Sequence, residues 1–290
     1  MSVFQISATQ RLGGHGPHHR FLRTATCVAI LGAIVVIGSL IPRGASAQSS
    51  ALARRISAAP DGRVRFVYAA RPGVCGNGNH ISRGNSGNTR WSYGESADVV
   101  WDEECSVGPV RIVAEVGGGR VTKLRTFVGG RWRPATGTVT DLGVVSARDA
   151  SDYLLSLVST STDRVAKEAI FPATIADSVV IWPALLRVAR DESRPAETRK
   201  QAVFWIGQAA GDAITANLAS LVGENEVDRE IRESAVFALS QQRNGEAVPA
   251  LIRIARTNRD PHIRKSALFW LGQSKDPRAL ALFEEILTRR

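Results

Sequence analysis

The sequence predicts an α+β chain in which a small antiparallel β module closed by a disulfide precedes an all-α αα-solenoid. A ten-residue segment that begins with arginine occurs three times near the C-terminus, 33 and then 32 residues apart. Such a period is typical of stacked supersecondary units. A Gly-rich stretch with strand-like segments and two cysteines precedes these repeats. The three copies are RKQAVFWIGQ (199–208), RESAVFALSQ (232–241) and RKSALFWLGQ (264–273).

Residues 1–47 have the pattern of a secretory signal peptide. Three arginines precede an apolar run at 27–41, no acidic residue is present, and a small-residue site ends at Ala47. We expect cleavage between Ala47 and Gln48, which would make the mature protein secreted or periplasmic with no stable membrane span. The alternative is an uncleaved anchor, because the 19 residues of 24–42 are just long enough to span a bilayer.

The positive charge of the chain lies outside the repeats. The whole sequence has 37 basic and 27 acidic residues, for a net charge of +10. Residues 48–141 carry 13 basic and 8 acidic side chains, whereas residues 142–290 carry 20 and 19. A nearly neutral solenoid lacks the basic surface that nucleic-acid binding needs, so we expect no nucleic-acid partner.

The β-rich module is expected at residues 48–141. A short helix at 51–58 opens it, and the expected strands follow at 63–69, 109–116 and 120–128. Three glycines separate the last two strands and predict a hairpin. The segment between the first two strands is rich in Gly, Asn, Ser and Arg and is expected to be a long loop.

Cys75 and Cys105 bound this loop. Cys27 begins the apolar run of the leader and is expected to be removed with it, which leaves these two as the only cysteines of the mature chain. Export to an oxidising compartment favours a disulfide between them. Closing a loop of about 30 residues stabilises the fold by roughly 3 to 4 kcal/mol in the chain-entropy model. The alternative, a redox or metal-binding pair, lacks Cys-x-x-Cys spacing.

Residues 142–290 are expected to form four helical hairpins and a partial fifth. Each repeated segment is a first helix, and an earlier copy lies at 166–175. Second helices are expected at 182–190, 213–222, 247–255 and 279–287. Residues 147–158 would form the partial hairpin. At helical periodicity one face of each first helix is apolar, which predicts a repeat core of Ala202, Ile206, Ala235, Leu239, Ala267 and Leu271.

These motifs resemble bacterial HEAT-like repeats of the type first named for phycobilin lyase subunits. The resemblance rests on the R-x-x-A-x-x-x-[LI]-[GS]-Q helix, the D-P-R-A-L turn and the V-P-A-L-I-R-I-A helix, and it covers 149–290. It implies an αα-solenoid whose usual work is protein–protein interaction. A minority of similar proteins are linked to bilin attachment or to hydroxylation of a lysine derivative, and one is a DNA glycosylase.

The sequence offers little for catalysis. His80 and His262 are the only histidines of the mature chain, and neither lies beside a nucleophile-elbow motif. No spacing resembles a zinc or di-iron site. The acidic residues at 102–104 favour a solvated loop over a cation site. We therefore predict no catalytic, cofactor-binding or metal-binding residue, no cofactor and no enzymatic activity.

A second row of side chains lies away from the core stripe. Its members, called here the Phe/Gln ladder, are Phe204, Gln208, Phe237, Gln241, Phe269 and Gln273. If solvent-facing, the ladder is a candidate partner-binding surface. The favoured alternative is that the phenylalanines pack between first helices and the glutamines bond to neighbouring backbone. Arg199, Arg232 and Arg264 are expected to brace adjacent turns, for example toward Asp228 or Asp260.

Three tryptophans of the β module, Trp91, Trp101 and Trp132, occur among arginines such as Arg90, Arg131 and Arg133. Such pairs can stack on sugars or bases, or they can form the apolar cover of a small sheet. The favoured function is a non-catalytic extracytoplasmic scaffold that binds a protein partner through its repeats. The alternative is capture of a glycan or cell-wall ligand by the Cys75–Cys105 loop with the solenoid as a stalk, and a lyase- or hydroxylase-type enzyme is less favoured.

Overall fold

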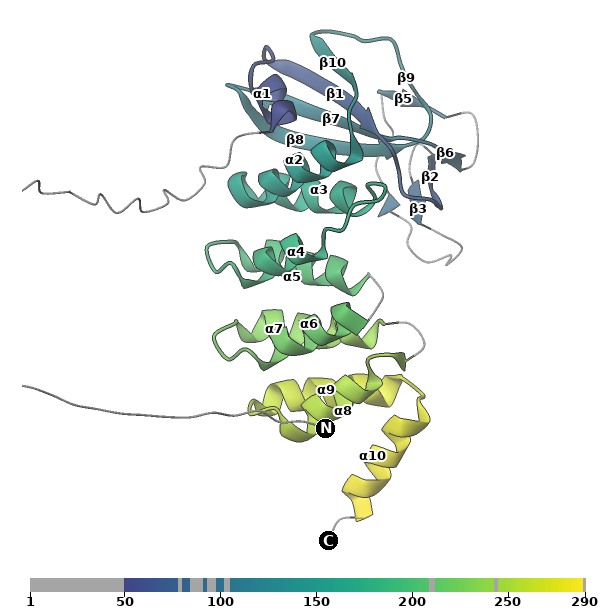
Figure 1. Cartoon of the computed structure of the whole chain (residues 1–290), viewed down its shortest axis with the longest axis vertical. Coiled ribbons are helices and arrows are strands. Elements are labelled where there is room, and N and C mark those ends of the chain that lie inside the picture. Colours follow the sequence, from purple (N-terminus) through teal and green to yellow (C-terminus); the bar gives the residue numbers. More distant parts are fainter. Residues whose placement is uncertain are drawn as a thin grey trace, which may run out of the picture. The chain divides into compact units, whose positions relative to one another are not determined.

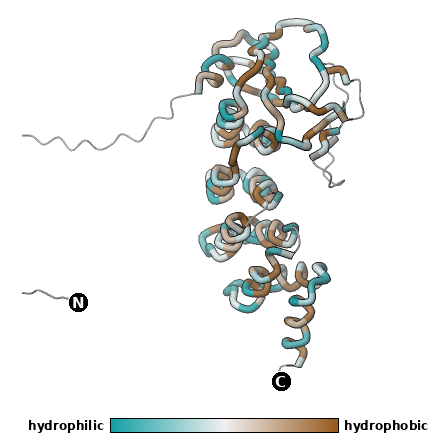
Figure 2. The backbone as a smooth tube through the Cα atoms, turned by 45° about the vertical axis from the view of Figure 1, so that its right-hand side comes forward, coloured by the Kyte–Doolittle hydropathy of each residue, from teal (hydrophilic) through white to brown (hydrophobic). Residues whose placement is uncertain are grey.

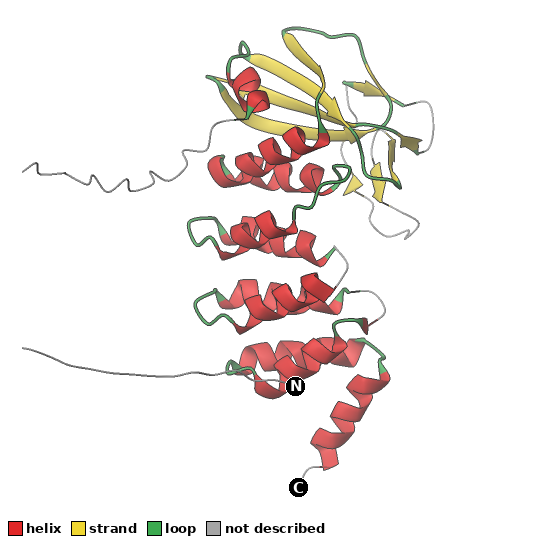
Figure 3. Ribbon diagram, viewed as in Figure 1, coloured by secondary structure: helices red, strands yellow, loops and turns green. Residues whose placement is uncertain are grey.

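The chain folds into a β-rich part followed by a stack of helices (Figure 1 and Figure 3). This architecture confirms the predicted α+β class with an αα-solenoid. The predicted leader and its cleavage site at Ala47 lie outside the residues that the structure describes. The computed structural model describes residues 50–77, 80–83, 91–92, 98–101, 105–208, 212–242 and 245–288.

The main sheet has four strands in the order β10-β1-β7-β8. Helix α1 (Ala51–Ser57) precedes β1 (Gly62–Tyr68), β7 (Val110–Gly117), β8 (Arg120–Val128) and β10 (Val139–Val144). β1, β7 and β8 pair antiparallel as predicted, and Gly118 and Gly119, both with positive φ, form the turn between β7 and β8. β10 is absent from the prediction and pairs parallel with β1, so one edge departs from the antiparallel pattern.

Short strands occupy the segment that was expected to be one long loop. β2 (Val74–Asn77), β3 (His80–Arg83), β4 (Trp91–Ser92) and β6 (Ser106–Val107) form a second sheet, and β5 (Val99–Val100) pairs with β9 (Arg131–Trp132). The predicted disulfide is present: Cys75 of β2 and Cys105 have Cα atoms 5.2 Å apart. A Cβ on Gly76 would lie 2.7 Å from the Val128 carbonyl oxygen, so glycine lets β2 approach the end of β8.

The stack contains the predicted helices, each within a few residues of its expected bounds. The first helices of the hairpins are α3 (Asp163–Thr174), α5 (Ala196–Gly207), α7 (Arg229–Ser240) and α9 (Pro261–Gln273). The second helices are α4 (Trp182–Arg190), α6 (Asp212–Gly223), α8 (Val248–Thr257) and α10 (Pro277–Thr288). α2 (Ala147–Thr160) packs against α3, and α4, α6 and α8 each pack most closely against the first helix that follows them in the chain (Figure 1), so the closest pairs are offset by one helix from the expected hairpins. In the described part of the chain, no helix has the length and apolar character needed to cross a membrane.

Local signals define the helix ends. Proline occupies the first turn of α4, α8 and α9, where a missing N–H costs no helical hydrogen bond. The Asp260 carboxylate caps α9 by accepting a hydrogen bond from the His262 amide at 2.9 Å. The Ser146 hydroxyl caps α2 in the same way, through the Asp149 amide. These caps explain why the bounds could be anticipated.

One hydrophobic core runs from the main sheet into the stack. One sheet face packs on α2 and α3, where the Phe66 and Tyr153 rings meet edge to face at 6.4 Å. The Tyr68 hydroxyl donates a hydrogen bond to the Pro172 carbonyl of α3 at 2.7 Å. The sheet thus covers the N-terminal end of the stack (Figure 1), and Figure 2 shows hydrophobic residues continuing along the helices to α10. The domain boundary at residue 141 stays a prediction.

Candidate functional site

The predicted repeat core lies inside the stack. Six side chains that are at most 1% exposed make up this stripe: Ala202, Ile206, Ala235, Leu239, Ala267 and Leu271. Small residues let the first helices approach closely, and Gly207 at the end of α5 shows how closely. A Cβ added to Gly207 would lie 2.7 Å from the Cβ of Ala238 in α7, which is too close for two side chains.

The phenylalanines of the Phe/Gln ladder differ in how far they pack between repeats. The Phe237 ring lies 5.0 Å from that of Trp270 in the next first helix, and Phe171 and Trp205 repeat this contact at 5.1 Å. Phe204 is half-buried. Phe269 is 57% exposed, because no further first helix covers it among the described residues. The ladder therefore presents one open ring, at its C-terminal end.

The glutamines of the ladder lie closer to solvent. Gln208 is half-buried, and Gln241 and Gln273 are exposed. The packing interpretation expects these glutamines to hydrogen-bond to the backbone of a neighbouring repeat. Another glutamine, the next residue after Gln241, makes such a bond. Buried Gln242 donates to the Gly207 carbonyl at 2.8 Å and joins α7 to α5. The sequence feature that could have indicated this contact is the pair of consecutive glutamines at 241 and 242. Whether the ladder binds a partner stays a prediction.

The repeated arginines brace adjacent turns, as predicted. Arg232 pairs with Asp260 at 2.9 Å, and Arg199 pairs with Asp228 while its Nε donates to the Ala189 carbonyl at 3.0 Å. The Arg199 and Arg232 side chains are only 2% and 8% exposed. Removing an acidic partner would leave a buried cation, so these contacts hold the repeats together.

Ion pairs also join the C-terminal ends of second helices. Arg190 of α4 donates two hydrogen bonds to Glu224, at 2.8 and 2.5 Å, and Arg256 of α8 pairs with Glu285 of α10. The hydrogen bonds from Arg190 lower the pKa of the Glu224 carboxyl below its ordinary value, and partial burial opposes them. Arg190 and Arg256 occupy equivalent positions in the repeat, and both are engaged in ion pairs.

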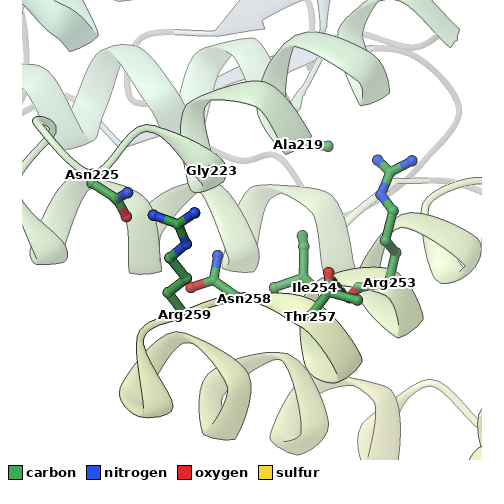
Figure 4. A pocket seen from close by; sticks show the side chains of 8 residues that line it. All are labelled: Ala219, Gly223, Asn225, Arg253, Ile254, Thr257, Asn258 and Arg259. Atoms are coloured by element: carbon green, nitrogen blue, oxygen red, sulfur yellow. Dashed lines mark hydrogen bonds between the residues drawn. The ribbon is translucent and has the colours of Figure 1, made fainter.

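Two grooves open beside the second helices, at places where no binding surface was predicted. One lies between α2 and α4, with a volume of about 500 Å³; Val180, 73% exposed, lies on its apolar wall and Arg187 on its rim. The other lies between α6 and α8, with a volume of about 390 Å³ (Figure 4). Both arise from the spacing of helices distant in sequence, so local periodicity does not reveal them.

The described tryptophans of the β module are part of its packing. Trp101 donates to the Val128 carbonyl at 2.9 Å. The guanidinium groups of Arg65 and Arg111 lie 5.0 and 5.1 Å from the centre of the Trp132 ring. Both rings pack against a small apolar cluster that includes Phe127. This arrangement agrees with the apolar-cover interpretation. The side chain of Trp91 lies outside the described residues.

The histidines and acidic residues form no metal-binding group in the described part of the chain. No set of three or more His, Cys, Asp or Glu side chains there is placed to hold an ion. His80 is half-buried in β3, and His262 is exposed in the first turn of α9. The acidic residues at 102–104 lie outside the described stretches.

Comparison with protein-family models finds HEAT repeats at residues 224–290. This match spans the four helices α7 to α10. It supports a HEAT-repeat protein. Comparison with curated proteins finds no match.

Proposed function

We propose that the chain is a non-catalytic extracytoplasmic scaffold that binds a protein partner through its stacked helical hairpins. The observation that carries the proposal is the stack itself, whose C-terminal part matches HEAT repeats. HEAT repeats commonly mediate protein interactions and typically have no catalytic role. A stack whose units contact only their neighbours presents long exposed faces to a partner.

The location is proposed from the leader and the disulfide. Residues 1–47 have the pattern of a secretory signal, and the Cys75–Cys105 bond suits an oxidising compartment. N-terminal sequencing of the protein purified from its own cells should begin at Gln48, in the extracytoplasmic fraction. A chain that keeps Met1 and stays in the cytoplasm would contradict this part of the proposal.

Two surfaces of the stack are proposed for partner contact. On the first-helix side, Phe269 and Gln273 form the accessible end of the Phe/Gln ladder. On the second-helix side, the two grooves provide concave surface that arginine side chains help to line. Glycan capture by the β module is the weaker candidate, because Trp101 and Trp132 are engaged in packing.

Affinity capture with the full chain tests the proposal. The tagged protein is crosslinked in its own cells, and bound proteins are identified by mass spectrometry. One variant changes Phe269 and Gln273 to alanine, another changes Val180 and Arg187 to serine, and a control changes Val107, which is 79% exposed in the β module, to serine. We expect a partner that a stack variant loses and the control keeps.

Two outcomes contradict the scaffold proposal. One is that no protein is enriched over an unrelated exported protein with the same tag. The other is a partner that is lost only when Val107 is changed, because contact would then lie on the β module. Thermal melts of all variants must match wild type, which separates loss of contact from loss of folding.

A further inference from the structure

The groove between α6 and α8 exists because α6 has small residues where its neighbours have large ones. Ala219 and Gly223 line the groove one helical turn apart. In the repeat alignment, which advances by 33 residues, Ala219 corresponds to Leu186 and Gly223 corresponds to Arg190. A Cβ added to Gly223 would meet no atom within 4 Å. The groove is therefore a local departure from the repeat pattern.

Two arginines in this groove have no acidic partner among the residues that the structure describes. Figure 4 shows Arg253 and Arg259 at opposite ends of the groove, with Ile254 between them. Both are exposed, and neither guanidinium forms an ion pair or hydrogen bond within the described stretches. Arg190 and Arg256, near the C-terminal ends of α4 and α8, are both paired with glutamates. Unpaired cations thus gather where the stack is open.

The remaining polar groups suit a carboxylate. Asn225 and Asn258 line the groove beside Arg259 (Figure 4). A side-chain amide has two N–H donors, of which Asn258 uses one for the Val222 carbonyl at 3.4 Å, so its second N–H can donate to an anion. A guanidinium binds a carboxylate through two parallel hydrogen bonds. Ile254 is only 6% exposed and gives the middle of the groove an apolar floor. The groove therefore matches two acidic side chains on either side of a small or apolar residue.

A nucleic acid fits this groove less well than a peptide. The groove has two free arginines, and residues 142–290 as a whole carry 20 basic and 19 acidic side chains. A phosphate backbone requires a continuous basic surface. Two separate arginines suit two separate carboxylates better than a row of phosphates.

We propose that the groove between α6 and α8 binds an acidic segment of a protein partner, with one carboxylate on Arg253 and another on Arg259. This rests on the proposed scaffold function and specifies the chemistry of its partner. Gly223 keeps the groove open, and Asn225 and Asn258 orient the carboxylate at the Arg259 end.

Selection from a random peptide library tests the groove without knowledge of the partner. The full chain is the bait, and peptides that bind the Gly223→Leu variant are removed, because leucine fills the groove while both arginines remain. We expect the surviving peptides to carry two acidic residues separated by small or apolar ones. Survivors without acidic pairs, or no peptide that distinguishes the two baits, would overturn the proposal.

Affinities of the selected peptides give the second readout. Arg253→Gln and Arg259→Gln should each weaken binding about tenfold or more, as expected for loss of charged hydrogen bonds. Arg187→Gln, at the other groove, is the matched control and should change nothing. An equal loss in that control, or tighter binding of a duplex DNA oligonucleotide that the same substitutions weaken, would contradict a peptide site.

The partner-capture experiment separates the two proposals. If wild type captures a protein through the stack and the Arg253→Gln, Arg259→Gln double variant captures it equally well, the groove inference fails and the scaffold function stands. If no protein is captured but the library yields peptides that depend on Gly223, the scaffold proposal fails while the groove remains an acidic-peptide site.

Discussion

Replacing Leu271 by alanine tests which face of α9 is buried in the stack. Leu271 is 1% exposed in α9, whereas Phe269, two residues earlier, is 57% exposed. Leu→Ala in a core costs about 2 to 5 kcal/mol, from lost transfer free energy and the cavity left behind. Complete burial of a phenylalanine contributes roughly 1.5 to 3 kcal/mol, so a half-exposed ring should contribute about 1. The leucine should therefore cost at least twice as much as the phenylalanine.

Urea unfolding of both alanine variants, followed by circular dichroism and hydrogen exchange, checks this ratio. Repeats contact mainly their neighbours. In Leu271→Ala the backbone amides of α7 to α10 should therefore exchange faster, whereas the amides of β7 and β8 should stay protected from exchange. Leu271→Asp buries an unpaired charge and should unfold the last hairpins. The register would be wrong if Phe269→Ala cost more than Leu271→Ala, or if Leu271→Asp melted like wild type.

Three further predictions concern the disulfide, the ion pairs and the joint between sheet and stack. Native protein should resist thiol labelling until reduced, and Cys75→Ser with Cys105→Ser should lower the unfolding free energy by roughly 3 to 4 kcal/mol; free thiols in native protein would disprove the bond. The pair of Glu224 and Arg190 should stabilise the fold above the unfolded carboxyl pKa of about 4.3 and lose this effect as pH falls through the lower folded value. Glu224→Gln should therefore reduce the acid sensitivity of the melting temperature, and an unchanged pH profile would count against the pair. Tyr68→Phe leaves a buried carbonyl of α3 without its donor, so a melt that shows no loss would contradict the expected cost of about 1 to 3 kcal/mol.

The helices could be predicted because their signals are local. Apolar residues at helical spacing, a capping Asp260 and proline in the first turn all lie within the helix they define. β10 could not be predicted, because its strand character depends on parallel pairing with β1, far away in sequence. The same holds for the short strands β2 and β6, which the disulfide and pairing across the loop hold together.

The binding surfaces followed only partly from the sequence. Periodicity gave the row of phenylalanines, but only the positions of neighbouring helices show that Phe237 packs on Trp270 while Phe269 remains open. The groove between α6 and α8 had a signal in the aligned repeats, since Ala219 and Gly223 replace larger residues. These small residues indicate a groove only when α6 and α8 are known to lie side by side.

Site-specific photocrosslinking of the full chain in its own cells tests the central claim most directly. A photoreactive residue replaces Ser220, an exposed position on α6, or Phe269 on α9, and Val107 of the β module serves as the control. The scaffold account predicts one discrete protein adduct from at least one stack position and none from Val107. An adduct formed only from Val107, or none from either stack position, would contradict it.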